Sequence, residues 1–451
     1  MRMESTIKKN EEYEVEIVDL GINGEGVAKI NGQVVFVPFA LPGEIVKILI
    51  INTKAKIAVG KVIEIIKPSP DRVIEECPYF KKCGGCALQH LKYEKTLEFK
   101  RNLVKNNLKN IGKIDAEVRE CEKSEPYSYR NKCAIPVVFE NGKTLLGMFR
   151  ENSHKIVPIE KCAICGDYAE KIIKIMQKYI EKFNIAGFNE ENNSGYLRHI
   201  VARKLNESVV ITLVITKSEL LGKEYLINEF KKVFGEFSLW INVNKKATNV
   251  IFGDKFTQIF GKNAETNIMG LNISVNPASF MQINDTIRDK IYKKVENLID
   301  AKKIVIDVYS GAGVMTGITS KKSKHSYGLE IVPEATADAN NLAKINGINN
   351  MTNICGDATK TLPELIKTLK GQEVEIILDP PRKGCTKEVL EAVINAKPEK
   401  IIYISCNSAT LARDLNFFFE ICADYEIEDI TPYDMFPQTP HVETMVVLRR
   451  K

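Results

Sequence analysis

The sequence lacks any long apolar run. No stretch of its 451 residues approaches the roughly 20 consecutive apolar residues that a membrane-spanning helix requires. The N-terminus, MRMESTIKKNEEYEVE, also lacks the apolar segment of a secretory signal. A strong charge imbalance is missing too, since 64 basic and 58 acidic residues give a net charge of +6. We therefore expect a cytoplasmic protein without membrane contact, whose mild charge permits a nucleic-acid partner without indicating one.

Cysteine is plentiful by comparison, with eleven residues unevenly spread along the chain. Cys77, Cys83 and Cys86 have the spacing C-x5-C-x2-C, and Cys162 and Cys165 form a second close pair. A reducing cytoplasm does not favour a disulfide framework, so the pattern predicts a metal site, with unpaired reduced thiols as the alternative. Zinc and a [4Fe–4S] cluster both take four thiolates, and spacing alone does not decide between them.

The pattern of apolar and polar residues divides the chain into three regions. Residues 5–67 alternate apolar and polar positions and carry two Asn-Gly hairpin signals, which predicts a small closed β-barrel of OB type. Residues 72–270 predict a central α+β domain that carries the cysteines. Residues 271–451 alternate apolar strands with helices, which predicts an α/β, Rossmann-like doubly wound sheet.

Within the central region, a basic amphipathic helix is expected near residues 91–112, and we expect it to pack on the third region. A further helix is expected near residues 167–183. Strands are expected at residues 133–140, 144–150, 208–216 and 238–244.

In the third region, polar residues stand where the expected strands end. A Gly-x-Gly turn follows Tyr309, and Glu330, Asp357 and Asp379 end the next strands. Each carboxylate alone is readily explained as a helix cap. Because ligands bind at the carboxyl ends of parallel strands, the group together predicts a site for an adenosine-bearing ligand. The pyrophosphate fingerprint is incomplete, which favours S-adenosylmethionine over a dinucleotide.

The strand KIIYIS runs directly into Cys406, and a helix is expected to start at Asn407 and Ser408. The positive end of a helix lowers a thiol's pKa, so this position predicts a nucleophile, with a buried structural cysteine as the alternative. Glu443 stands at the start of the last strand and is a candidate general base, with a surface glutamate as the alternative.

Four stretches together resemble the RNA uracil-C5 methyltransferases. They are FMQIN (280–284), DPPRKG (379–384), SCNSATLARD (405–414) and HVE (441–443). The N-terminal barrel resembles this family's TRAM domain, and the cysteine group resembles the iron–sulfur site of its ribosomal RNA members. Two positions depart from the family's pattern: Ser310 stands where cysteine is common, and Ser408 stands where proline is common.

The resemblance implies a mechanism. Cys406 would add to uracil C6, and Glu443 would later remove the proton from C5. Five residues would bind or position the methyl donor, S-adenosylmethionine, and the base: Gln282, Tyr309, Glu330, Asp357 and Asp379. Four residues would hold a [4Fe–4S] cluster, namely Cys77, Cys83, Cys86 and Cys162, with Cys165 as the local competitor for the fourth place.

The expected activity is therefore methylation of a uridine in 23S ribosomal RNA, by a monomer with no DNA partner. A transfer-RNA uridine is the near alternative. Because transfer-RNA members of the family generally lack the TRAM domain and the cluster, both features favour ribosomal RNA. An amino-group methyltransferase is a second alternative, but Arg382 occupies the place of the aromatic residue in its motif. A non-catalytic RNA-binding protein is the third, and the presence of both Cys406 and Glu443 argues against it.

Overall fold

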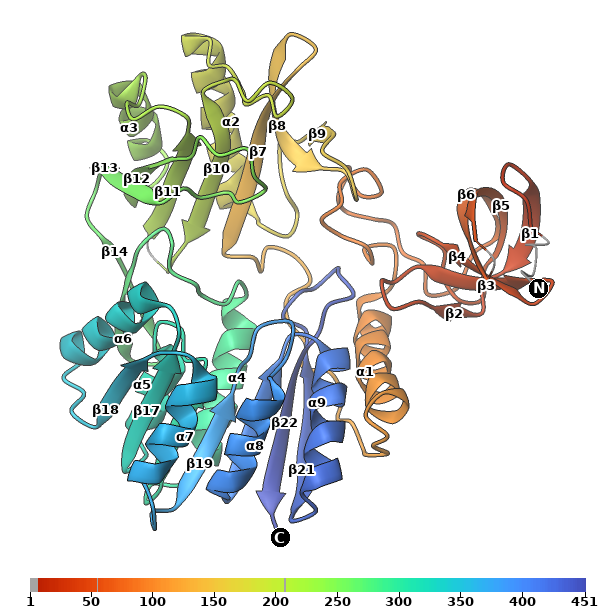
Figure 1. The fold of residues 1–451 in the computed structure, drawn as a ribbon. Helices are drawn as coiled ribbons and strands as arrows, with labels where there is room; N and C mark the ends of the chain where they lie inside the picture. The colour runs from red at the N-terminus through yellow and green to blue at the C-terminus, as the bar shows by residue number, and fades with distance from the viewer. Residues whose placement is uncertain (1–6, 55, 207) are drawn as a thin grey trace.

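A computed structural model describes residues 7–54, 56–206 and 208–451 (Figure 1). Residues 5 and 6, with which the predicted barrel begins, lie outside the described residues, as do the first four residues of the chain. Among the described residues, no helix combines the length and the apolar character needed to cross a bilayer.

The N-terminal region is a six-stranded sheet in the order β1-β5-β6-β4-β3-β2. The sheet closes because β1 and β2 are consecutive in the chain, and Val18 between them donates to the carbonyl of Val27 at 2.8 Å. Alternating burial along β5 explains the alternating sequence, since every second side chain enters the barrel core. The strands are β1 (Glu12–Glu16), β2 (Asp19–Leu20), β3 (Gly26–Ile30), β4 (Gln33–Val37), β5 (Ile45–Thr53) and β6 (Ile57–Lys67).

The central region contains a seven-stranded mixed sheet in the order β13-β12-β11-β10-β7-β8-β9, covered by α2 (Asp167–Phe183) and α3 (Lys223–Lys231). Strand β10 was not expected, because Arg198 and Arg203 interrupt its apolar pattern although both side chains are buried. The strands are β7 (Lys132–Glu140), β8 (Lys143–Phe149), β9 (Ile156–Pro158), β10 (Leu197–Lys204), β11 (Ser208–Ile215), β12 (Glu236–Val243) and β13 (Lys255–Phe260), followed by the hairpin β14 (Ala264–Ile268) and β15 (Leu271–Val275).

The C-terminal region is a seven-stranded sheet in the order β18-β17-β16-β19-β20-β22-β21, with helices on both faces, as the sequence predicts (Figure 1). β22 runs in the opposite direction to the other six strands of this sheet. The strands are β16 (Ile304–Val308), β17 (His325–Glu330), β18 (Met351–Cys355), β19 (Val374–Leu378), β20 (Lys400–Ser405), β21 (Tyr425–Tyr433) and β22 (Glu443–Arg450). The helices are α4 (Asp285–Leu298), α5 (Val314–Ser320), α6 (Pro333–Ile345), α7 (Ala358–Thr368), α8 (Lys387–Ala396) and α9 (Ser408–Ile421).

Helix α1 (Tyr93–Asn110) belongs to the central region in sequence but packs against α9. Its Val104 and Leu108 are fully buried in the same core as α7, α8 and α9, so α1 extends the helical layer on that face of the C-terminal sheet. Because β22 runs antiparallel, its first residue lies at the edge where the parallel strands β16 to β20 end. That edge carries the candidate site.

Candidate active site

The fold brings Cys406 next to Glu443. The antiparallel pairing of β20 and β22 ends at Ser405 and Thr444, and Cys406 and Glu443 are the next residues on the two segments. The two side chains lie close enough for the charge of Glu443 to raise the pKa of the Cys406 thiol. The predicted nucleophile and the predicted base, 37 positions apart in sequence, are therefore neighbours in the fold.

The surroundings of the Cys406 thiol differ from expectation in one respect. Asn407 caps α9, and its side chain accepts from the Ala409 amide at 3.0 Å, as the sequence predicts. The pKa of Cys406 is nevertheless raised to about 11, first by burial and then by the carboxylate of Glu443. The guanidinium of Arg382, which is hydrogen-bonded to the thiol, opposes this rise. The expected lowering by the helix end was wrong, because burial and the two nearby acids outweigh it.

Two carboxyl groups share this site. Glu443 is 2% exposed, and burial raises its pKa well above the usual range, with the nearby Asp379 adding to the rise. Burial likewise raises the pKa of Asp379 to about 7. Arg382 also faces Glu443 and lowers its pKa. Two acids with raised pKa values beside a thiol and one cation form the kind of group that acid–base chemistry requires.

The loop that carries Arg382 is held by the start of α9. The Arg382 carbonyl accepts from Asn407 Nδ2 at 3.3 Å and from Thr410 Oγ1 at 3.2 Å. The Asp414 carboxylate accepts from the Cys385 amide at 2.8 Å and from the Tyr403 hydroxyl at 2.6 Å. The stretches DPPRKG and SCNSATLARD are thus two halves of one hydrogen-bonded unit, which places Arg382 beside the thiol.

The acids at the ends of β17 and β18 serve local structure. Glu330 accepts from the Gly311 amide at 2.9 Å, which ties the Gly-x-Gly turn to the end of β17. Asp357 is exposed and caps α7, accepting from the Thr359 amide at 2.9 Å, so the capping alternative is realised there. Tyr309 has a left-handed backbone, with φ of 71°, and its hydroxyl is hydrogen-bonded to Cys385. All three stand at the same sheet edge as Cys406.

Gln282 lies half-buried in the loop before α4, where its carbonyl accepts from Asn131 Nδ2 at 3.0 Å. Asn284, two residues on, caps α4 and donates to the Met435 carbonyl at 3.4 Å. These contacts hold the FMQIN stretch against the loop that leads to Glu443. They do not bring the Gln282 side chain into contact with Cys406 or Asp379 within the described part of the chain.

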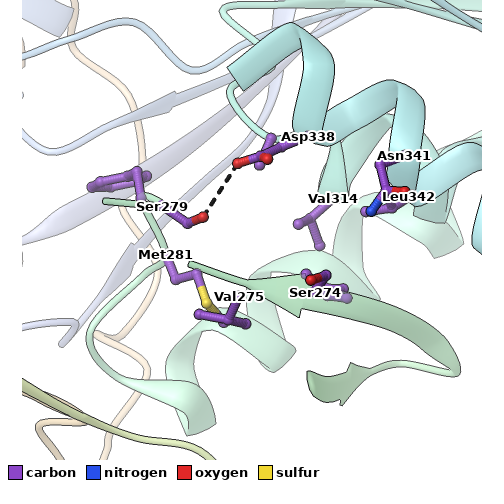
Figure 2. Close-up of a pocket in the computed structure, with 11 residues that line it drawn as sticks. Ser274, Val275, Ser279, Met281, Val314, Asp338, Asn341 and Leu342 are labelled. Carbon is purple, nitrogen blue, oxygen red and sulfur yellow. Dashed lines mark hydrogen bonds between the residues drawn. The ribbon is translucent and has the colours of Figure 1, made fainter. Parts of the chain in front are cut away.

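A small pocket of about 10 Å³ lies beside the Gly-x-Gly turn. Figure 2 shows Ser279 and Asp338 facing each other across it, joined by a hydrogen bond of 3.2 Å. Its walls come from β15, the stretch 279–281, the start of α5 and α6. None of the five predicted cofactor residues lines it, and neither does Cys406, so this pocket is separate from the cluster around the thiol.

The cysteine group comes together from two segments. The pKa of Cys86 is raised to about 12, mainly by burial and in part by the neighbouring thiols of Cys162, Cys83 and Cys77. Cys165 is buried and forms hydrogen bonds with Cys133 and Cys162 instead. In the described residues, no three His, Cys, Asp or Glu side chains are placed to hold a metal ion as they stand. The four predicted ligands are neighbours, yet they are not drawn together around one point.

Comparison with known proteins identifies the family. Residues 92–451 match the family described as tRNA (uracil-5-)-methyltransferase, and residues 8–63 match the TRAM domain. The chain belongs to the RNA uracil-5-methyltransferases. An uncharacterized RNA methyltransferase of Clostridium acetobutylicum is 40% identical over 454 residues, 98% of each chain. A second, from Clostridium tetani, is 40% identical over 456 residues, which cover 99% of this chain and 98% of the relative.

Among solved structures, the tRNA (uracil-54, C5)-methyltransferase of Pyrococcus abyssi in complex with S-adenosyl-L-homocysteine is similar. It is 28% identical with a TM-score of 0.78, and the match covers 96% of this chain and 99% of that one. Because it covers 96% of this chain, the match includes the region of the N-terminal barrel.

The structure of this uracil-5-methyltransferase adds residues that the sequence did not single out. Arg382 was noted for replacing an aromatic residue, but its contact with the Cys406 thiol was not foreseen. Asp307, near the end of β16, is buried with a pKa raised to about 7 by burial and accepts from Thr316 Oγ1 at 2.6 Å. The signal for Arg382 was its place at a strand end, the same signal that marked Asp379.

Proposed function

We propose that this protein transfers a methyl group from S-adenosylmethionine to C5 of a uridine in 23S ribosomal RNA through a covalent Cys406 adduct. The observation that carries the proposal is the closeness of Cys406 and buried Glu443 at the ends of β20 and β22, with Arg382 hydrogen-bonded to the thiol. Family membership supplies uracil C5 and RNA as the chemical target.

The chemistry assigns a task to each side chain. Uracil C5 is a weak nucleophile until the Cys406 thiolate adds to C6, which moves the electron pair of the C5–C6 double bond onto C5. C5 then attacks the methyl carbon of S-adenosylmethionine, the bond between that carbon and the sulfonium sulfur breaks, and S-adenosylhomocysteine leaves. Glu443 then takes the remaining C5 proton, the C5–C6 double bond forms again, and the bond between C6 and the Cys406 sulfur breaks. Arg382 stabilises the thiolate before addition and after release.

The methyl donor would lie along the edge formed by Tyr309, Glu330 and Asp357, with Asp379 and Gln282 toward the base. The bound S-adenosyl-L-homocysteine of the Pyrococcus abyssi enzyme supports a donor of this class. Asp357 keeps only part of its carboxylate for a ligand, since one oxygen caps α7. The uracil must leave its stack to reach Cys406, so the substrate is a flipped base.

Cys77, Cys83, Cys86 and Cys162 would hold a [4Fe–4S] cluster. The donor set fits, because four thiolates are the usual ligands and these four are electrostatic neighbours. Zinc takes the same thiolate ligands, and the preference for a cluster rests on the resemblance of this cysteine group to the iron–sulfur site of the ribosomal RNA members of the family. The charge of Cys162 acts on both Cys83 and Cys86, which favours Cys162 over Cys165 as the fourth ligand. The methylation uses no electron from this group.

A transfer-RNA uridine is the second candidate substrate, and the Pyrococcus abyssi enzyme favours it because that enzyme matches nearly the whole chain. The test incubates the enzyme with ribosomal and transfer RNA and maps each new methyl group. In parallel, RNA with 5-fluorouridine at the mapped position should trap the enzyme. A base can remove the C5 proton of uridine but not a C5 fluorine, so the covalent adduct cannot be released. A Cys406→Ala enzyme that still methylates or still crosslinks would refute the adduct. Methylation of transfer RNA alone would refute the ribosomal target.

A further inference from the structure

Helix α1 reaches both halves of the catalytic pair. We propose that Lys100 of α1 is a positioning residue for proton removal: it fixes the loop 434–442 and thereby the place of Glu443. The inference rests on the proposed roles of Cys406 and Glu443. It concerns a residue more than 300 positions away in the chain, on a helix that lies before the central sheet.

The anchor is a buried ion pair. Lys100 and Asp434 are both 0% exposed, and the Lys100 ammonium is hydrogen-bonded to the Asp434 carboxylate. The same ammonium donates to the Phe436 carbonyl at 3.0 Å. The Tyr93 hydroxyl, about two turns earlier on α1, donates to the second Asp434 oxygen at 2.7 Å and accepts from the Ser124 amide at 2.9 Å. Two side chains of one helix thus hold the first residues of the loop.

The rest of the loop is held by neighbouring segments of the central region. The Pro437 carbonyl accepts from the Tyr129 hydroxyl at 3.1 Å. The Gln438 carbonyl accepts from the amides of Ala87 and Leu88 at 2.9 and 3.1 Å. Gln438 is buried and has φ of 66°, a left-handed conformation that few residues other than glycine adopt. A loop kept in such a conformation depends on its outside contacts to stay in place.

The other end of α1 fixes this frame to the nucleophile. Asn107 Nδ2 donates to the Ser408 hydroxyl at 2.8 Å, two residues beyond Cys406. Gly112, just after the helix, approaches α9 so closely that a Cβ there would lie 3.1 Å from the Ala412 carbonyl oxygen. One helix therefore contacts both the start of α9 and the loop before β22. A shift of either would change the separation between Cys406 and Glu443.

Burying an ion pair costs desolvation energy, and apolar replacements of such pairs are often as stable. Unlike an apolar residue, Lys100 fixes particular atoms of the loop, because its ammonium is hydrogen-bonded to the Asp434 carboxylate and to the Phe436 carbonyl. Proton transfer is sensitive to such placement, and a misplacement of about 1 Å can cost about 100-fold in rate. Positioning by Lys100 should therefore act on release of the adduct, the step that Glu443 performs, more than on its formation by Cys406.

The test separates these two steps. Wild-type enzyme, Lys100→Met and the double variant Lys100→Met/Asp434→Asn are mixed with RNA that carries tritium at C5 of the target uridine, under single-turnover conditions. The double variant leaves no unpaired buried charge, so it keeps the test valid where Lys100→Met alone unfolds. Lys105→Met, an exposed lysine of the same helix, is the matched control. Covalent complex on denaturing gels reports adduct formation, and tritium in water reports proton removal.

We expect tritium release to slow at least tenfold in the Lys100 variants, while adduct formation changes less than threefold and Lys105→Met matches wild type. Equal slowing of both steps would show a merely structural role and overturn the inference, as would unchanged release in the double variant. A wild-type enzyme that releases tritium without any Cys406 adduct would instead refute the proposed function, and the inference with it.

Discussion

Arg382 is the cation that opposes the raised pKa of Cys406, which makes its removal a direct test of the site's electrostatics. Arg382→Gln removes the charge and keeps a polar side chain of similar reach. The pKa of the thiol, already raised from 9.0 to about 11, should rise further. A higher thiol pKa means less thiolate at a given pH, so adduct formation should slow in the variant. At high pH the two enzymes should converge, because both thiols are then ionised.

The size of the effect follows from the same environment. With a pKa of about 11, roughly one thiol in 1,000 is ionised at pH 8, and that fraction rises about tenfold per pH unit. Arg382 is exposed, so water screens part of its charge, and about 1 kcal/mol is a reasonable share for it. That energy corresponds to an about fivefold slower formation of the adduct at pH 8.

The assay follows the covalent complex with 5-fluorouridine RNA from pH 7 to pH 9.5, with RNA and methyl donor saturating. Lys383→Gln is the control, because it removes the adjacent exposed charge without a contact to the thiol. Wild-type rates should climb across the whole range, and Lys383→Gln should follow them. The reasoning fails if the wild-type rate levels off below pH 8, or if both variants slow equally at every pH.

Three further predictions concern other parts of the site. Glu443→Gln should lower turnover by about 10²–10⁴-fold while its adduct with ordinary uridine accumulates on denaturing gels; normal turnover would contradict the assigned base. Cys162→Ser should lose iron and sulfide from anaerobically purified protein, whereas Cys165→Ser should keep them, and stoichiometric zinc in wild type would contradict the cluster. Asp414→Asn weakens the acceptor for the Cys385 amide and the Tyr403 hydroxyl. It should lower the free energy of unfolding, measured in urea, by about 1–3 kcal/mol. Substitution of the exposed Glu420 by Gln is the control and should leave that free energy unchanged.

The sequence predicted the fold well where apolar periodicity was strong. The strands and helices of the C-terminal sheet follow near-continuous apolar runs, and the alternation in the barrel matches its buried faces. Strand β10 was missed because buried arginines occupy it. Arg203 donates to the Ser279 carbonyl at 3.1 Å, and Arg198 donates to the Lys246 carbonyl at 2.7 Å. Carbonyl partners from distant segments thus hold two side chains that the sequence alone would place on the surface.

The fold brings the predicted residues Cys406, Asp379 and Glu443 close together, but the expected pKa direction of Cys406 was wrong. Strand ends marked Cys406 and Asp379, but the pKa direction of Cys406 came from a local argument, the start of α9. The dominant influences are burial and Glu443, which depend on the antiparallel direction of β22 and its place beside β20. Neither feature can be read from the residues near Cys406. Lys100 and Asp434 lie still further apart in sequence, and no motif links them.

The same burial has opposite consequences for the two proposed catalytic groups. It raises the pKa of Cys406, so little thiolate exists for the first step at neutral pH. It also raises the pKa of Glu443, so its carboxylate holds a proton from C5 more strongly than an exposed glutamate would. Arg382 lowers both pKa values, which helps addition and weakens the base. An Arg382 variant should therefore slow the first step while leaving release of the adduct as fast as in wild type or faster, a pattern opposite to that expected for Lys100.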